Sequence, residues 1–395
     1  MLARLAAPLA LLAPAVACSD GASSPTDAAT TLASDATDAS DAADVGPTRA
    51  FRMGFQPWPY DLTQAAVDWT WDRISQDGDV YSIHMEEGVP WPEAAAGSAF
   101  STDYQATLAA KKAAIQPGHA VFLSVNALDT SRSGLARYRG DGIAEPLPAP
   151  FDTAALDSEL VMDAYTAYCE RMIDLFEPDW FLVGIEVNIL YRQHPELWPA
   201  YLRLVRHVRA ALAASHPGLP VGASVFANSY VETYSDPAET PTAQRAALAE
   251  LRPSLDFLGL SVYPFMSQHL CEDLTADYMP TIFALGDGLP VAVTESGYSA
   301  QHWSTTVGTT SLDWNGSEAK QDDFLTRLLS AAEAAQAPFV IWFAVRDYDA
   351  LWEHIGRDPT ALVWRDTGLF DEDGNARSAH ATWRAMLARP LSARR

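Results

Sequence analysis

The chain has 395 residues, of which 51 are Asp or Glu and 26 are Lys or Arg, for a formal net charge of −25 at pH 7. So acidic a surface argues against nucleic acids and polyanionic substrates as partners, whereas neutral polymers remain compatible with it. The length is enough for one large hydrophobic core or two ordinary ones.

Residues 1–17 have the features of a signal peptide. Arg4 supplies the positive charge, residues 5–15 form an apolar run, and Ala15–Ala17 is a small-residue cleavage site directly before Cys18. The arrangement resembles the lipobox of bacterial lipoproteins, which implies a lipid on Cys18 and a membrane anchor. The expected location is then extracytoplasmic, at the outer membrane or cell surface. Cleavage after Ala17 without lipidation, giving a secreted or periplasmic protein, is the alternative.

Residues 18–48 are built almost wholly from Ala, Ser, Thr and Asp. They contain almost no large apolar side chains to bury, so this segment is predicted to be a disordered linker with a reach of about 30 Å. The remainder, residues 49–395, is expected to be one domain and a monomer. Cys169 and Cys271 are expected not to form a disulfide.

From residue 51 onward, apolar strand-like runs alternate with amphipathic helical stretches. The predicted strands are 51–56, 79–84, 120–126, 180–187, 220–227, 257–263, 290–295 and 339–345. The predicted helices are 61–76, 102–115, 157–176, 195–214, 242–251, 274–284, 317–335 and 379–387, the first opened by a capping box at Asp61 and Gln64. This α/β pattern predicts a single (β/α)₈ TIM barrel. An open doubly wound sheet is the alternative, but the turn at 56–60 lacks the glycines of a nucleotide-binding loop.

Two predicted strands end in a glutamate. Glu186 closes the fourth, and Glu295 closes the seventh within Thr294-Glu295-Ser296-Gly297-Tyr298. An ionised carboxylate at the edge of an apolar core is costly unless it is paired or used. Because barrel chemistry takes place at the carboxyl ends of the strands, these two residues are the main candidates for catalysis.

These residues resemble clan A retaining glycoside hydrolases, including the cellulase-like and arabinogalactan endo-β-galactanase families. Ser261-Val262-Tyr263-Pro264 is similar to their sixth strand, and residues 366–377 to the segment before their last helix. The resemblance implies that Glu295 is the nucleophile, that Glu186 is the acid/base, that Tyr263 contacts the nucleophile, and that Trp342 floors the subsite at the scissile bond.

One position departs from the clan, which usually has Asn immediately before the strand-four glutamate. This chain has Ile185 there. Asn188 would share a strand face with Glu186 by alternation, so either Asn188 substitutes in part or a contact to the sugar 2-hydroxyl is lost.

Other candidates lie at the same rim. His84 and Asn126 end the second and third strands and are predicted to bind sugar hydroxyls, whereas Glu86 and Glu87 are assigned to a loop surface. Aromatic residues in the predicted loops there favour a carbohydrate cleft; they are Trp58, Tyr60, Trp91, Trp303 and Trp314. No metal-binding or cofactor motif is present.

The sequence therefore predicts a retaining hydrolase of neutral β-linked oligo- or polysaccharides. A glycan-binding barrel without catalysis, which Ile185 favours, and a surface scaffold are the alternatives.

Overall fold

The structure, a computed structural model, describes residues 47–392 apart from 237–239, 268–272 and 308–309. The predicted signal peptide, Cys18, nearly all of the linker and Cys271 lie outside the described residues. Cys169 is a buried free thiol. In the described ranges, no helix has both the length and the apolar character to cross a bilayer.

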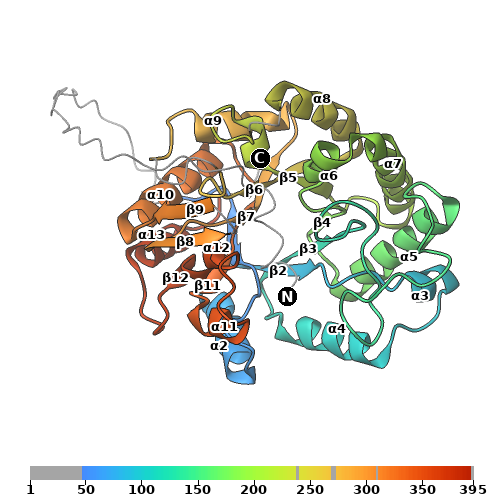
Figure 1. Cartoon of the computed structure of the whole chain (residues 1–395), viewed down its shortest axis with the longest axis horizontal. Coiled ribbons are helices and arrows are strands. Elements are labelled where there is room, and N and C mark those ends of the chain that lie inside the picture. The colour runs from blue at the N-terminus through green and yellow to red at the C-terminus, as the bar shows by residue number, and fades with distance from the viewer. Residues whose placement is uncertain (1–46, 237–239, 268–272, 308–309, 393–395) are drawn as a thin grey trace, which may run out of the picture.

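Eight parallel strands form the predicted barrel, in the order β1-β10-β7-β6-β5-β4-β3-β2 (Figure 1). They are β1 (Arg52–Phe55), β2 (Val80–Met85), β3 (Ala120–Val125), β4 (Trp180–Leu182), β5 (Val221–Phe226), β6 (Phe257–Val262), β7 (Val291–Ser296) and β10 (Phe339–Trp342). The barrel is nearly closed, because β1 and β2 touch without a continuous ladder. At this seam the amide of Asp79 donates to the carbonyl of Met53 at 2.8 Å. Gly54 is required there, since a Cβ would lie 2.2 Å from the carbonyl oxygen of Val80.

Helices surround the strands (Figure 1). The predicted ones are α2 (Gln64–Asp77), α4 (Thr102–Ala114), α5 (Glu159–Phe176), α7 (Trp198–Ser215), α8 (Pro241–Leu251), α9 (Tyr278–Phe283), α10 (Glu318–Ala334) and α13 (Ser378–Leu387). Serine side chains cap α4, α5 and α10. The capping box predicted at Asp61 is wrong, because Thr63 is the N-cap of α2 and its hydroxyl accepts from the amide of Ala66.

Several short elements were not predicted. They are α3 (Trp91–Ala96), α6 (Asn188–Gln193), α11 (Asp349–His354), α12 (Leu362–Arg365), the antiparallel hairpin β8 (His302–Val307) and β9 (Thr310–Asn315), and the parallel pair β11 (Ala344–Arg346) and β12 (Gly368–Phe370). Short 3₁₀ turns occur at 195–197, 227–230, 252–254 and 284–286.

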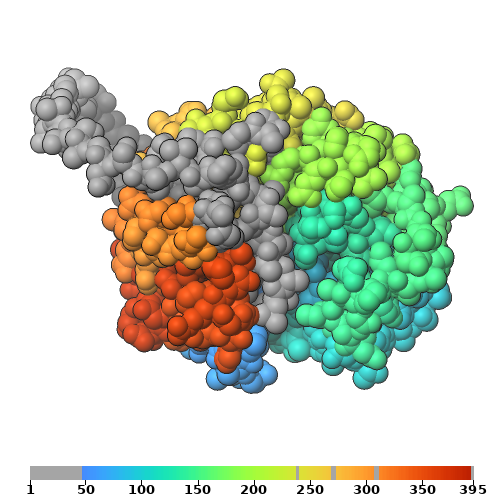
Figure 2. Space-filling model, in the orientation of Figure 1, coloured from blue at the N-terminus to red at the C-terminus, as the bar shows by residue number. Residues whose placement is uncertain are grey.

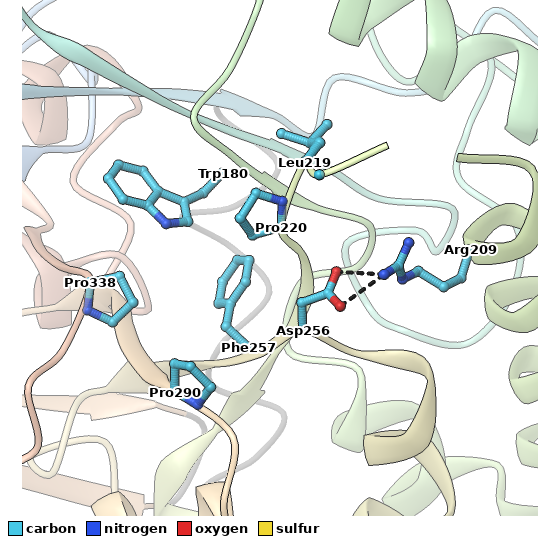
Figure 3. A pocket seen from close by; sticks show the side chains of 9 residues that line it. Trp180, Arg209, Leu219, Pro220, Asp256, Phe257, Pro290 and Pro338 are labelled. Atoms are coloured by element: carbon cyan, nitrogen blue, oxygen red, sulfur yellow. Dashed lines mark hydrogen bonds and ion pairs between the residues drawn. The ribbon is translucent and has the colours of Figure 1, made fainter. Parts of the chain in front are cut away.

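Aromatic side chains fill the barrel near its amino-terminal end. The rings of Phe122 and Phe339 lie 4.5 Å apart, and those of Trp180 and Phe339 lie 5.0 Å apart. Since β3 and β10 are not neighbours in the sheet, these rings meet across the interior. Trp180 and Phe257 line a cavity of ≈ 280 Å³ at this end, together with three prolines that precede strands (Figure 3). These aromatic rings form a packed layer that fills the amino-terminal end of the barrel interior.

A layer of inward-facing serines lies above these rings. Ser82, Ser124, Ser224 and Ser261 come from β2, β3, β5 and β6 and are buried. The runs predicted to be apolar strands are therefore polar on the inner face near their carboxyl ends. A buried hydroxyl requires a partner, and three of these serines contact residues of the candidate site described below.

Three aspartates converge beside the β11–β12 pair. Asp347 and Asp366 are fully buried, and Asp349 is partly exposed. Arg377 is ion-paired with Asp347, and Arg365 lies 2.8 Å from Asp366. Burial raises the pKa of Asp349 to about 6, and the negative charge of Asp366 adds to this effect.

This raised pKa predicts a pH-dependent stability. Because the folded-state pKa of Asp349 lies above the usual 3.8, its stabilising contribution is complete below about pH 4 and is lost as the pH rises through about 6. Asp349→Asn keeps the neutral form and is expected to raise Tm at pH 7 to 8 but not at pH 4. Thermal unfolding at both pH values tests this, with exposed Asp373→Asn as the control. An equal gain at both pH values would contradict it.

Candidate active site

A β-bulge directs Glu295 into the mouth of the barrel. Leu260 of β6 pairs with Val293 of β7, but Ser261 pairs with Glu295, so Thr294 is an extra residue on β7. Ala292 faces the interior, and simple alternation would turn Glu295 outward. The bulge reverses that alternation and places the carboxylate inside.

Groups from two sides of the barrel hold this carboxylate. The Tyr263 hydroxyl donates to its Oε2 at 3.2 Å, and Ser261 Oγ lies 3.4 Å from the same oxygen. His84 Nδ1, from β2, lies 3.6 Å from Oε1. Glu295 is buried, so these polar contacts supply partners to a carboxylate that would otherwise be costly to place there.

His84 links Glu295 to a second carboxylate. Its Nε2 lies 3.4 Å from Oε2 of Glu86, and its Nδ1 lies 3.0 Å from Ser124 Oγ. The Trp58 ring stands edge-on to the imidazole at 5.7 Å. His84 and Trp58 therefore lie at the rim, where they were predicted to contact substrate.

Glu186 does not end a strand as predicted. β4 stops at Leu182, and Glu186 lies four residues beyond it with φ at +50°. Its amide donates to Ser224 Oγ at 2.9 Å, which fixes this unusual conformation. The side chain remains partly exposed, and Oε2 lies 3.6 Å from Nη2 of Arg132.

Arg132 joins the two carboxylates that surround it. This residue, in the loop between β3 and α5, is almost fully buried. Its Nη2 lies 2.7 Å from Glu86 Oε1, and its Nε donates to the carbonyl of Ile185 at 2.8 Å. Glu295, His84, Glu86, Arg132 and Glu186 thus form a continuous chain of contacts across the mouth.

The assignment of Glu86 to a loop surface is wrong, because its side chain is only 4% exposed and pairs with Arg132. Glu87 is separate and lies 3.4 Å from Lys111. Asn126 reaches the same group, its Nδ2 donating to Glu86 Oε1 at 3.2 Å.

Two other expectations are corrected. Asn188 does not share a strand face with Glu186, since it begins α6 and binds the backbone of Phe226 through both its Nδ2 and its Oδ1. Trp342 faces outward from the barrel, is fully buried near Phe324 of α10, and donates from Nε1 to the carbonyl of Thr367 at 3.0 Å. A ring without exposed surface cannot floor a sugar subsite.

A different tryptophan borders the site. The ring of Trp364, from α12, lies 5.0 Å from the Tyr263 ring and 4.7 Å from that of Phe343. Trp91 is a core residue whose Nε1 donates to the carbonyl of Ala136. Trp303 and Trp314 stack on each other within the β8–β9 hairpin at 4.0 Å. Of the predicted aromatic cluster, Trp58 remains close to the candidate carboxylates.

Both halves of the chain contribute to the site. In Figure 2 the cyan-to-green segments lie on the right of the molecule, and the yellow-to-red segments lie at the top and on the left. His84, Glu86, Asn126, Arg132 and Glu186 come from the first, and Tyr263 and Glu295 from the second. The site therefore forms only when both halves of the barrel are folded together.

No protein-family model matches the sequence, and no curated protein does. Solved structures do match. The exo-beta-1,4-mannosidase Op5Man5 of Opitutaceae bacterium strain TAV5 aligns with a TM-score of 0.59 and 16% identity, over 88% of this chain and 61% of that one. This chain thus spans less than two thirds of that protein.

Two further structures are GH5_18 proteins in complex with Manβ1-4GlcNAc. The one from Streptomyces cattleya aligns with a TM-score of 0.58 and 15% identity, over 85% of this chain and 80% of that one. The one from Bifidobacterium longum subsp. longum ATCC 55813 has the same TM-score at 14% identity, over 87% of this chain and 80% of that one. These likenesses show that the chain shares the (β/α)₈ barrel fold of these structures.

For the glycoside hydrolysis proposed below, Tyr263→Phe is expected to lower kcat by about 10-fold, because it removes a hydrogen bond to the Glu295 carboxyl group. KM should change little, since the hydroxyl contacts Glu295. Steady-state kinetics on a cleaved glycoside measure both constants. Tyr165→Phe is the control, because its hydroxyl is bonded to the carbonyl of Val183 and does not reach Glu295. An unchanged kcat in Tyr263→Phe would contradict this role.

Proposed function

We propose that the protein is a retaining glycoside hydrolase of neutral β-linked oligo- or polysaccharides, with Glu295 as nucleophile and Glu186 as acid/base. One observation carries the proposal. Two carboxylates at the mouth of the barrel have contrasting surroundings, Glu295 buried and held by Tyr263 and His84, and Glu186 partly exposed beside Arg132.

Each carboxylate has a distinct task in this mechanism. An oxygen of Glu295 attacks the anomeric carbon while Glu186 protonates the departing glycosidic oxygen, so that the bond between carbon and leaving group breaks. Glu186 then removes a proton from water, which attacks the anomeric carbon and releases Glu295. Two inversions give net retention of the β-configuration.

β-Mannosides are the first substrate class to test. The similar structures named above include an exo-β-1,4-mannosidase and two proteins bound to Manβ1-4GlcNAc. The net charge of −25 is consistent with an uncharged sugar. Trp58 and Trp364 are the rim aromatics suited to pack against sugar rings.

A glycan-binding barrel without catalysis is the second candidate. Ile185 carries this alternative, because its side chain lies in the apolar interior with Leu182 and Phe339. That position therefore offers no amide to a sugar.

Hydrolysis of 4-nitrophenyl β-glycosides, β-1,4-mannobiose and neutral β-glycans by the purified full chain separates the two candidates. Proton NMR of the product as it forms then reports its configuration. Initial release of the β-anomer supports the proposal, and initial release of the α-anomer contradicts the retaining mechanism. Glycan binding without turnover supports the second candidate.

A further inference from the structure

Arg132 presents a difficulty for the proposed acid. A general acid must carry a proton at the working pH. A guanidinium beside a carboxylate favours its ionised form, and Nη2 of Arg132 lies 3.6 Å from Glu186 Oε2. Without a counter-charge, the Arg132 cation would hold Glu186 in its ionised form, which cannot donate a proton.

Glu86 opposes it. The same Nη2 of Arg132 lies 2.7 Å from Glu86 Oε1, which is a charge-assisted hydrogen-bond distance, whereas 3.6 Å is not. Glu86 and Arg132 are both almost fully buried, at 4% and 3% side-chain exposure, so their attraction is weakly screened. Asn126 Nδ2 and His84 Nε2 also hold Glu86 in place.

The backbone keeps Arg132 from turning toward Glu186. Its Nε is bonded to the carbonyl of Ile185 and its Nη1 to the carbonyl of Asp129 at 3.0 Å. These two bonds fix the plane of the guanidinium, and the remaining nitrogen, Nη2, then lies against Glu86. Arg132 also holds the peptide that precedes Glu186, at the position where Ile185 provides no polar side chain.

We propose that Glu86 is a positioning residue that holds the charge of Arg132 away from Glu186, so that Glu186 can carry the proton that it donates. The inference deepens the proposed function and rests on it. Among the described contacts, Arg132 meets Glu86 and the Tyr201 phenol, and Glu86 is linked through His84 to Glu295. Of these, Glu86 is the carboxylate in direct contact with the guanidinium.

Glu86→Gln tests the inference by removing this counter-charge while keeping the shape of the side chain. Both the lost negative charge and the freed Arg132 favour ionised Glu186, so its titration midpoint is expected to fall by about one pH unit. Carbon-13 NMR of the full chain labelled at glutamate δ-carbons follows this titration, with the Glu186 signal assigned from Glu186→Gln. In Glu87→Gln, which removes the neighbouring charge paired to Lys111, the midpoint should stay in place.

Arg132→Gln is the second variant, and it removes the cation itself. In this variant the titration midpoint of Glu186 is expected to rise. In a separate single variant, Glu86→Asp, the negative charge is kept, so the midpoint should stay close to the wild-type value. An unchanged or higher midpoint in Glu86→Gln, or an unchanged one in Arg132→Gln, would overturn the inference.

The rate profile gives a second readout. The alkaline limb of kcat/KM for β-1,4-mannobiose should move to lower pH in Glu86→Gln, a change that a merely structural residue would not produce.

Because the NMR titration needs no turnover, the proposed function and the proposed role of Glu86 can be rejected independently of each other. A wild-type protein that cleaves no glycoside rejects the hydrolase, whereas the titration alone decides whether Glu86 controls Glu186.

Discussion

Glu295→Gln is expected to abolish glycoside hydrolysis, with kcat falling by about 10⁴-fold or more, because the amide cannot form the glycosyl-enzyme. The substitution preserves the shape of the side chain and can still contact Tyr263 and His84, which hold the carboxylate at present. Glycan affinity should therefore survive. Initial rates on the most reactive aryl β-glycoside, together with calorimetric binding of the product sugar, measure the two effects.

Chemical rescue makes the test specific to a nucleophile. In Glu295→Ala, azide is expected to occupy the vacated space and attack the anomeric carbon from the same face, giving a glycosyl azide with inverted configuration. Glu250→Gln, an exposed change on α8, is the control and should leave the rates unchanged. If Glu295→Gln retained a tenth of wild-type activity, the nucleophile would have to be another carboxylate.

The eight barrel strands, and the position of Glu295 near the end of β7, could be predicted from sequence because each depends on a local pattern. Apolar runs between amphipathic helices give the strands, and seven of the eight differ from the structure mainly at their ends. The bulge at Thr294 could not be predicted, since it exists only in the pairing with β6. The strand was placed correctly, but the sequence could not show why its glutamate faces the interior of the barrel.

β4 shows where a local pattern misleads. Val183, Gly184 and Ile185 continue an apolar run, yet β4 ends at Leu182, although Val183 and Gly184 still exchange backbone hydrogen bonds with β5. Tyr201 of α7 packs so close to Gly184 that a Cβ there would lie 2.2 Å from the phenol oxygen. Hydropathy alone therefore extended the strand too far, and it gave no sign that a helix from later in the chain packs against Gly184.

Arg132, Glu86 and Trp364 were missed because long-range pairing decides their roles. Nothing in the loop around Arg132 indicates which carboxylate it will meet. A usable signal did exist on the strands, where a serine precedes a site residue by two positions in three cases, at His84, Asn126 and Tyr263. Two-residue alternation places each pair on one face, so buried serines mark the inward face of the barrel.

Glu186→Gln should produce the second large effect, and its size should depend on the leaving group. For β-1,4-mannobiose, whose leaving sugar needs a proton, kcat/KM is expected to fall by about 10²- to 10⁴-fold. For an aryl glycoside with an activated leaving group, bond cleavage needs little assistance, so the first step should be largely preserved. Slow hydrolysis of the glycosyl-enzyme should then appear as a burst of the phenol, because Glu186 is also the base for water.

The partly exposed position of Glu186 makes a further outcome decisive. Its side chain is 18% exposed, whereas Glu295 is nearly buried, so an external nucleophile can approach the Glu186 side of the mouth. Azide is therefore expected to accelerate turnover of aryl glycosides by Glu186→Gln and to give a product of retained β-configuration, the opposite of the product expected from Glu295→Ala. An equal loss on both leaving groups would assign Glu186 to structure. Opposite azide products from the two variants would instead place the two carboxylates on opposite faces of the sugar ring, as double displacement requires.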